Sequence, residues 1–205
     1  AVVANGEAVV SANGALVTWT PAESTGRSPL DTLMVKHPKT AHKIDWTAAN
    51  NIPLDPKTFD MMVTDAYTTL RKSTKVYSSD KVVGADASYA LPVKTVSNFA
   101  LTQVFVDNMF RAVPKGIAKS IFADKGFTIL VCPYDKFDPA RYEGRVRVDP
   151  RIDGTSTMVI AMDFDQRIGV VYGSAYCGSV KKTLFTVMNY MLPEAGILPI
   201  HCSAN

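Results

Sequence analysis

Short β-rich runs that alternate with helical patterns constrain the fold of this chain more than any other feature. Three such runs lie in the last third of the sequence, at residues 127–131, 158–162 and 166–171. A helical pattern at 180–192 follows them, with one apolar face formed by Val180, Leu184, Val187, Met188 and Met191. Because short strands need neighbours to pair with and helices to cover them, we expect a mixed α/β fold in which a β-sheet is packed with helices.

The first half of the chain predicts two further helices. Asp55-Pro56 is a helix start, with an N-cap carboxylate before a proline at the first helical position. An apolar stripe at helical spacing follows, through Phe59, Met62, Val63, Ala66, Tyr67 and Leu70. Residues 96–110 are apolar nearly all round and predict a buried helix. Residues 16–20 and 33–35 predict short strands, whereas 36–55 lose this periodicity, so we expect irregular chain without core residues there.

The organisation of the sequence favours one domain. Pro193 ends the predicted helix 180–192, and residues 197–201 predict another short strand. No internal repeat, low-complexity tract or linker divides the chain, so we expect residues 1–205 to form a single α/β domain. The first residues contain neither an initiating Met nor the basic and apolar regions of a secretory signal, so we expect the chain to begin inside a longer protein.

The charge distribution disfavours a nucleic-acid partner. Twenty-two basic residues stand against 19 acidic ones, which gives a formal net charge of +3 spread along the length. This balance is too even for the electrostatic footprint of a nucleic-acid binder. The basic segments are 36–43 and 141–151, and the arginines of the second alternate with Glu143 and Asp149, a pattern typical of a solvated loop.

Cysteine content and hydropathy indicate the compartment. The chain has an odd number of cysteines without close pairing: Cys132, Cys177 and Cys202. We therefore expect no disulfide framework and a reducing, cytoplasmic location. No apolar run approaches the ~20 residues that a membrane helix needs, so we expect no membrane partner.

The pair Lys181-Lys182 stands in the first turn of the predicted helix 180–192. Lys182 lies about 200° round the helical wheel from Val180, directed away from the core. A solvated lysine is the plain interpretation of that position. Two cations at the positive end of a helix dipole would, however, attract an anion. The same crowding would lower the pKa of a lysine and make a neutral amine available as a base or metal ligand.

His201 closes the predicted strand 197–201. A single histidine at a strand end is compatible with a structural hydrogen bond as well as with a ligand role. A structural zinc site is disfavoured because Cys177, His201 and Cys202 lack the paired short spacings of such sites.

Two motifs resemble a known family. The ungapped run from Tyr176 to Asn205 is similar to the ATP-dependent phosphoenolpyruvate carboxykinases: Tyr-Cys-Gly-Ser-Val-Lys-Lys-Thr-Leu-Phe-Thr-Val-Met-Asn-Tyr-Met-Leu-Pro-Glu-Ala-Gly-Ile-Leu-Pro-Ile-His-Cys-Ser-Ala-Asn. Thr-Gly-Arg-Ser-Pro at 25–29 resembles a loop of the same family and precedes the lysine pair in the family's order. Between 36 and 167 the resemblance is weak, so it is carried by the two ends of the chain.

The resemblance implies an amino-terminal, substrate-binding domain and a set of site residues. Arg27 would grip a carboxylate of oxaloacetate, a role that suits the planar fork of a guanidinium. Tyr176 would contact the substrate and the departing CO₂. Lys182 and His201 would ligate a transition metal, typically Mn²⁺, and both must be unprotonated to bind it. Lys182 would also contact the substrate.

The implied reaction decarboxylates oxaloacetate to an enolate, which takes the γ-phosphoryl group of ATP to give phosphoenolpyruvate, CO₂ and ADP, a lyase step of gluconeogenesis. Phosphoryl transfer requires Mg²⁺ and a phosphate cradle, commonly G-x-x-x-x-G-K-[ST]. No such motif occurs in residues 1–205. In the family this motif follows the present segment. We therefore expect the carboxy-terminal nucleotide-binding domain to lie outside this chain, and the isolated chain to be inactive.

The chain departs from the family pattern at both motifs. Leu30-Asp31 stands where the family usually has Lys-Asp, and Cys-Gly-Ser-Val at 177–180 replaces Gly-Gly-Glu-Met. The roles of Leu30, Cys177 and Ser179 therefore stay open. A second hypothesis is a non-catalytic domain that keeps Arg27, Tyr176 and Lys182 as a carboxylate or phosphate site, and it predicts binding without turnover.

Overall fold

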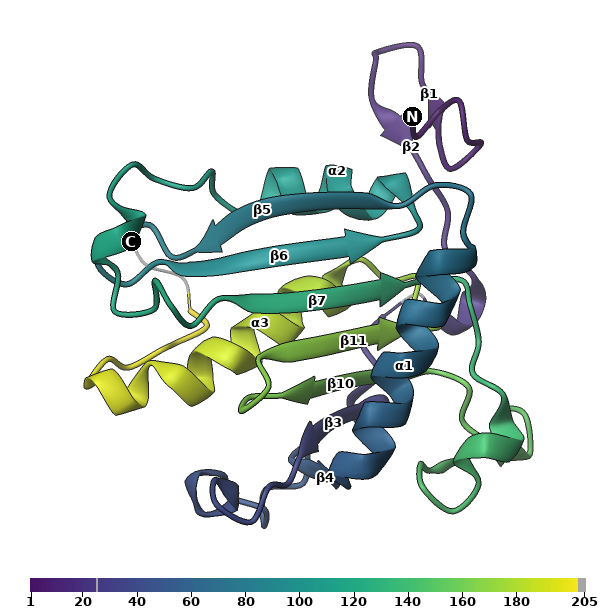
Figure 1. Cartoon of the computed structure of the whole chain (residues 1–205). Helices are drawn as coiled ribbons and strands as arrows, with labels where there is room; N and C mark the ends of the chain where they lie inside the picture. Colours follow the sequence, from purple (N-terminus) through teal and green to yellow (C-terminus); the bar gives the residue numbers. More distant parts are fainter. Residues whose placement is uncertain (25, 203–205) are drawn as a thin grey trace.

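The computed structural model describes residues 1–24 and 26–202, so Thr25 and the last three residues of the family-like run lie outside the described part. A seven-stranded sheet forms its centre, in the order β4-β3-β10-β11-β7-β6-β5 (Figure 1). The strands are β3 (Thr32–Val35), β4 (Ile52–Leu54), β5 (Tyr77–Val83), β6 (Leu91–Ser97), β7 (Phe127–Cys132), β10 (Val159–Asp163) and β11 (Ile168–Tyr172). The expected mixed α/β class is confirmed.

Strand direction changes twice along the sheet, between β10 and β11 and between β6 and β5. β6, β7 and β11 are mutually parallel, whereas β10 is antiparallel to β11 and parallel to β3. β4 is parallel to β3, and β5 is antiparallel to β6. In consequence, the start of β3 and the end of β11 lie at the same end of the strands, since Thr32 pairs with Ile160 and Tyr172 with Val159.

Helices cover both faces of this sheet (Figure 1). α1 (Pro56–Lys72) lies across one face, and α2 (Ala100–Met109) and α3 (Gly178–Met191) lie behind the other. Within residues 1–24 and 26–202, short 3-10 helices occur outside the main elements: η1 (Ala22–Ser24), η2 (Pro29–Asp31), η3 (Ala41–Lys43), η4 (Ile117–Lys119), η5 (Pro139–Tyr142) and η6 (Pro193–Ala195). Two hairpins stand apart from the sheet, β1 (Val9–Val10) with β2 (Leu16–Val17), and β8 (Val148–Asp149) with β9 (Gly154–Thr155).

The predicted start of the helix at Asp55-Pro56 is confirmed, and its apolar stripe is confirmed in part. The carboxylate of Asp55 accepts a hydrogen bond from the Thr58 backbone N–H, and Pro56 is the first helical residue of α1. Four stripe residues are buried in the core on this side of the sheet: Phe59, Met62, Ala66 and Leu70. Tyr67 is exposed and Val63 is only partly buried, so the buried stripe is narrower than the sequence pattern indicates.

The opposite face of the sheet carries a second core, and α3 supplies much of it. Val180, Leu184, Val187 and Met188 are buried there, as the helical pattern predicts. They pack with alternate residues of the central strands, among them Val93, Ile129 and Val171. This alternation follows from the two-residue period of a strand, which sends successive side chains to opposite faces.

Two predictions in the middle of the chain need correction. The helix expected at 96–110 begins only at Ala100, because Val96 belongs to β6, where Leu91, Val93 and Thr95 face the core in alternation. The stretch 36–55 is also not free of core residues. Ile52–Leu54 forms the edge strand β4, and Leu54 is buried against α1 because the open edge of β3 offers it backbone partners.

The strand expected at 197–201 is wrong. After η6, Gly196 adopts a left-handed conformation, and the chain continues without pairing to any strand of the described residues. Leu198 and Ile200 are 78% and 65% exposed. A β-rich sequence forms a strand only where a neighbour accepts its backbone hydrogen bonds, and none is available here.

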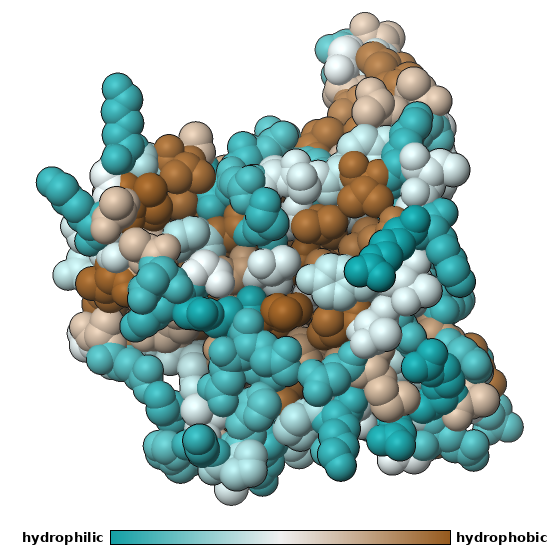
Figure 2. Space-filling model, viewed as in Figure 1, coloured by the Kyte–Doolittle hydropathy of each residue, from teal (hydrophilic) through white to brown (hydrophobic). Residues whose placement is uncertain are grey.

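Three further observations concern the surface and the cysteines. Cys132, Cys177 and Cys202 are free, as expected. Among the helices of the described residues, none combines the length and apolar character that crossing a bilayer requires. Figure 2 shows apolar side chains on the projecting hairpin β1–β2, where Val9, Val10, Leu16 and Val17 are each at least 43% exposed.

Candidate functional site

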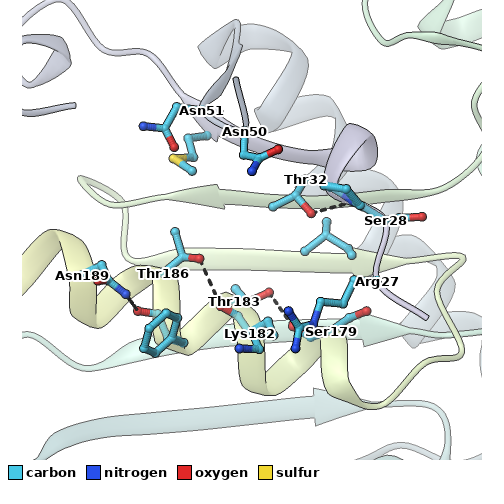
Figure 3. Close-up of a pocket in the computed structure, with 14 residues that line it drawn as sticks. Arg27, Ser28, Thr32, Asn50, Asn51, Ser179, Lys182, Thr183, Thr186 and Asn189 are labelled. Atoms are coloured by element: carbon cyan, nitrogen blue, oxygen red, sulfur yellow. Dashed lines mark hydrogen bonds between the residues drawn. The ribbon is translucent and has the colours of Figure 1, made fainter. Parts of the chain in front are cut away.

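A cavity of about 530 Å³ lies beside α3, near the end of the sheet where β3 begins (Figure 3). One wall is the loop before β3, a second is the first three turns of α3, and a third is the chain just before β4. The lining residues are Arg27, Ser28, Pro29, Thr32, Met34, Asn50, Asn51, Ile160, Ser179, Lys182, Thr183, Phe185, Thr186 and Asn189. Two of the four predicted site residues, Arg27 and Lys182, therefore meet in one cavity.

The loop that carries Arg27 is held by its own backbone and by the chain that follows β11. The Asp31 backbone N–H and the Thr32 hydroxyl both donate to the Ser28 carbonyl oxygen, at 3.1 and 2.9 Å. The hydroxyl of Ser24 accepts a hydrogen bond from the Ala175 backbone N–H at 3.4 Å. Arg27 itself is exposed and reaches from this loop towards α3 (Figure 3).

Side-chain hydrogen bonds hold the start of α3 in place. The hydroxyls of Ser174 and Ser179 lie 2.9 Å apart and are buried, and the Thr183 hydroxyl donates to the Ser179 carbonyl oxygen. Cys177, the N-cap residue, makes no side-chain capping bond. The positive end of the helix dipole therefore adds to the charges of Lys181 and Lys182 at this end of the cavity.

Lys182 occupies the polar side of α3, as the helical wheel predicts. Its Nζ lies 5.0 Å from the ring centre of Phe185, one turn further along the helix. Desolvation lowers the pKa of Lys182 below its usual value, and the charges of Arg27 and Lys181 lower it further. The Coulombic effect of Arg27 reflects the proximity of two cations from opposite ends of the sequence. Such a pair favours an anion between them.

His201 lies against the same aromatic ring but outside the cavity lining. Its imidazole meets Phe185 edge-on, with ring centres 5.6 Å apart, and the residue is exposed. Lys182 and His201 thus share Phe185 as a neighbour. Within residues 1–24 and 26–202, no three His, Cys, Asp or Glu side chains are grouped so that they could hold a metal ion. The two residues expected to ligate a metal, Lys182 and His201, supply one amine and one imidazole.

Tyr176 is half-buried and is not part of the cavity lining. Its ring lies over Gly178, because a Cβ built on Gly178 would stand only 2.5 Å from Cε1 of Tyr176. The glycine at the start of α3 therefore makes room for the tyrosine ring. This contact fixes where the phenol can lie relative to the first turn of the helix.

Leu30, Cys177 and Ser179, three of the positions that depart from the family pattern, have distinct environments. Leu30 is 59% exposed. Cys177 is half-buried, and burial raises the pKa of its thiol, so a thiolate is disfavoured at that position. Ser179 is buried and lines the cavity.

Sequence reasoning missed several polar residues of the lining. Thr186 and Asn189 follow Lys182 at positions +4 and +7, so the helical wheel contained the signal that they share its face. Asn50 and Asn51 come from the segment expected to be irregular, and their place in the cavity depends on the pairing of β4 with β3. No local sequence signal indicates that pairing.

Fold and site together define an α/β domain with a cationic cavity near the end of the sheet where β3 begins and β11 ends. A model of the phosphoenolpyruvate carboxykinase family matches residues 1–205. The phosphoenolpyruvate carboxykinase (ATP) of Geobacillus kaustophilus (strain HTA426) is 37% identical over 190 residues, which are 92% of this chain and 33% of that protein. The enzyme of the same name from Bacillus pumilus (strain SAFR-032) is 37% identical over 205 residues, 100% of this chain and 36% of that protein. The chain belongs to the ATP-dependent phosphoenolpyruvate carboxykinase family, and it spans about a third of the length of these relatives.

Proposed function

We propose that this chain forms the substrate grip of an ATP-dependent phosphoenolpyruvate carboxykinase. The reaction would be the metal-dependent conversion of oxaloacetate and ATP to phosphoenolpyruvate, CO₂ and ADP, as a step of gluconeogenesis. The observation that carries the proposal is the convergence of Arg27 and Lys182 on one cavity. Family membership supports it further.

The cavity suits a small dianion. The guanidinium of Arg27 can bind a carboxylate through two parallel hydrogen bonds. Lys182 and the α3 dipole add positive charge on the facing wall. Neutral donors in the lining come from the Ser28 hydroxyl and the Asn50 and Asn189 amides, whereas the Thr32 and Thr186 hydroxyls donate to backbone carbonyl oxygens. Oxaloacetate and phosphoenolpyruvate both carry two anionic groups of the kind that these side chains bind.

The donor chemistry is compatible with part of a transition-metal site. Lys182 and His201 would hold an ion such as Mn²⁺ through two nitrogen atoms, and the lowered pKa of Lys182 favours the neutral amine that this needs. When bound, such an ion would act as a Lewis acid beside the developing enolate. Lys182, Arg27 and Tyr176 would then orient the substrate and the departing CO₂. The Mg²⁺–ATP site would lie outside residues 1–205.

Ligand titration tests the site assignment. We expect phosphoenolpyruvate or oxaloacetate to bind the wild-type chain, with binding weakened at least about tenfold, roughly 1.4 kcal/mol, by Arg27→Ala or Lys182→Ala. Mn²⁺ should strengthen this binding in the wild type but not in His201→Ala. Lys119→Ala serves as a matched control, since this lysine lies in η4 outside the cavity lining. Unchanged binding in all three site variants would refute the assignment.

Turnover separates the enzyme hypothesis from the non-catalytic one. A polypeptide of residues 1–205 contains no G-x-x-x-x-G-K-[ST] cradle, so we expect it to form no phosphoenolpyruvate from oxaloacetate, ATP, Mn²⁺ and Mg²⁺. Robust turnover would contradict that expectation. In a longer polypeptide that includes such a cradle, the enzyme hypothesis requires turnover that Lys182→Ala abolishes. Binding without turnover in that polypeptide would favour the non-catalytic domain.

A further inference from the structure

We propose that Arg147 is a positioning residue for Arg27, and that it acts through the carboxylate of Asp31. The short helix η2 begins directly after Arg27 and Ser28, and Asp31 is its last residue. Arg147 lies far along the chain, just before the β8–β9 hairpin. The part of the proposal that concerns ligand binding rests on the proposed function of Arg27. The part that concerns the position of the loop does not.

The contact between the two residues is a two-pronged ion pair. Nε of Arg147 donates to Oδ1 of Asp31 and Nη2 donates to Oδ2, both at 2.8 Å. The Asp31 side chain is 2% exposed, and the Ser156 hydroxyl donates to its Oδ1 at 2.9 Å. Two parallel bonds fix direction as well as distance, which a single point charge does not. Asp31 is therefore held in one orientation.

The orientation of Asp31 is transmitted to Arg27 through the backbone. The Asp31 N–H donates to the Ser28 carbonyl oxygen at 3.1 Å, and the Thr32 hydroxyl donates to the same oxygen at 2.9 Å. Ser28 is bonded directly to Arg27. Any shift of the Asp31 side chain would move this closed turn, and with it the residue that points into the cavity.

Arg147 is itself held in place by the hairpin that follows it. The Ser156 backbone N–H donates to the Arg147 carbonyl oxygen at 3.0 Å, and Oδ2 of Asp149 lies 3.5 Å from Nη2 of Arg147. Asp149 is in turn bound by Arg151, with Nη2 2.6 Å from Oδ2. The segment 147–156 therefore supports the loop that carries Arg27 from outside the cavity lining.

Trypsin cleavage after Arg27 tests the position of the loop without any ligand. Arg27 is exposed and is followed by Ser28, so cleavage there reports local opening of the turn. We expect Arg147→Met to accelerate release of the peptide 1–27 at least about tenfold, because the open population rises. Arg145→Met is the matched control, since Arg145 contacts Thr58 of α1 instead of Asp31. A wild-type cleavage rate in Arg147→Met overturns the proposal, as does equal acceleration in the control.

A second variant guards against global unfolding. Arg147→Lys keeps the positive charge beside Asp31 but cannot form both parallel bonds. We expect it to retain the wild-type thermal midpoint within a few degrees, while cleavage after Arg27 is several-fold faster. If Arg147→Met does not fold, the rate in Arg147→Lys decides the proposal, and a wild-type rate there overturns it.

Phosphoenolpyruvate titration tests the consequence for binding. If the competent loop falls to about a tenth of the population, the apparent Kd rises about tenfold in Arg147→Met. In an Arg27→Ala background the same change should have a much smaller effect, because Arg27 is the charged group of this turn that binds the ligand. Equal weakening in both backgrounds overturns the proposal. If the wild type does not bind phosphoenolpyruvate at all, the proposed function falls, and cleavage after Arg27 still decides whether Arg147 positions the loop.

Discussion

Nε2 of His37 lies 2.7 Å from Oδ2 of Asp163, a carboxylate that is fully buried at the end of β10. The second oxygen of Asp163 accepts the backbone N–H groups of Asp165 and Gln166 in the β10–β11 turn. His37 follows β3 and opens the segment that leads to Asn50 and Asn51. One side-chain contact therefore ties the start of that segment to the end of β10.

We predict that His37→Ala lowers the free energy of unfolding by about 1–3 kcal/mol, because it leaves one oxygen of a buried carboxylate without its partner. His37→Gln retains a donor and should cost less. Thr40→Val is the control, since the Thr40–Asp165 hydrogen bond is exposed and its loss should stay within about 0.5 kcal/mol. Urea denaturation measures all three. Equal losses in His37→Ala and Thr40→Val would contradict a special role for the buried pair.

Asp55 gives a prediction about α1. Asp55→Ala should lower the free energy of unfolding by about 1 kcal/mol at neutral pH, since it removes the cap on the Thr58 N–H, whereas Asp55→Asn should retain most of it. The Thr58 backbone N–H lowers the pKa of the Asp55 carboxyl in the folded state. The capping contribution is therefore present above the ordinary pKa and is lost as the pH falls through the folded one. Urea midpoints that still differ equally well below that pKa would argue against the ionised cap.

Local sequence patterns predicted the helices, whose backbone hydrogen bonds lie within the element, better than the strands, which need a neighbouring strand. α1 could be located from Asp55-Pro56 and its stripe, and α3 from the spacing of Val180, Leu184 and Met188. The edge strand Ile52–Leu54 could not, because it exists only through its pairing with β3. The error at 197–201 has the same origin, since strand-forming residues without a neighbouring strand stay irregular.

The site residues also fall into two groups: some follow from helical spacing, and others depend on contacts between distant segments. The wheel placed Lys182 on the polar face of α3, and the same reasoning extended to Thr186 and Asn189 would have found more of the lining. Arg27 entered only through a family motif, because spacing cannot indicate that two distant segments meet. The contact of Phe185 with both Lys182 and His201 depends on where the chain runs after η6, which no periodicity determines.

Gly178 offers a test of the Tyr176 position. Alanine is favoured over glycine inside a helix by about 1 kcal/mol, but a Cβ at residue 178 would stand 2.5 Å from the tyrosine ring. We predict that Gly178→Ala displaces that ring, weakens phosphoenolpyruvate binding about tenfold or more, and leaves the thermal midpoint nearly unchanged. Gly116→Ala is the control, because Gly116 lies outside the cavity lining and its added Cβ would meet only an ordinary contact, at 3.5 Å from the Ala87 side chain. Tight binding by Gly178→Ala would show that the Tyr176 ring has no part in the grip.

The proximity of Arg27 and Lys182 can be measured directly through the lysine. Desolvation, Arg27 and Lys181 together lower the pKa of Lys182, so Arg27→Ala should raise it towards the ordinary value, while Arg27→Lys should leave it low. Side-chain NMR titration of Lys182 follows this shift residue by residue. The same ionisation sets two opposite trends in the wild type. As the pH rises through the lowered pKa, phosphoenolpyruvate binding should weaken because a cation is lost, and Mn²⁺ binding should strengthen because the neutral amine is the ligand. An identical Lys182 pKa in Arg27→Ala and the wild type would mean that the two side chains do not face one cavity.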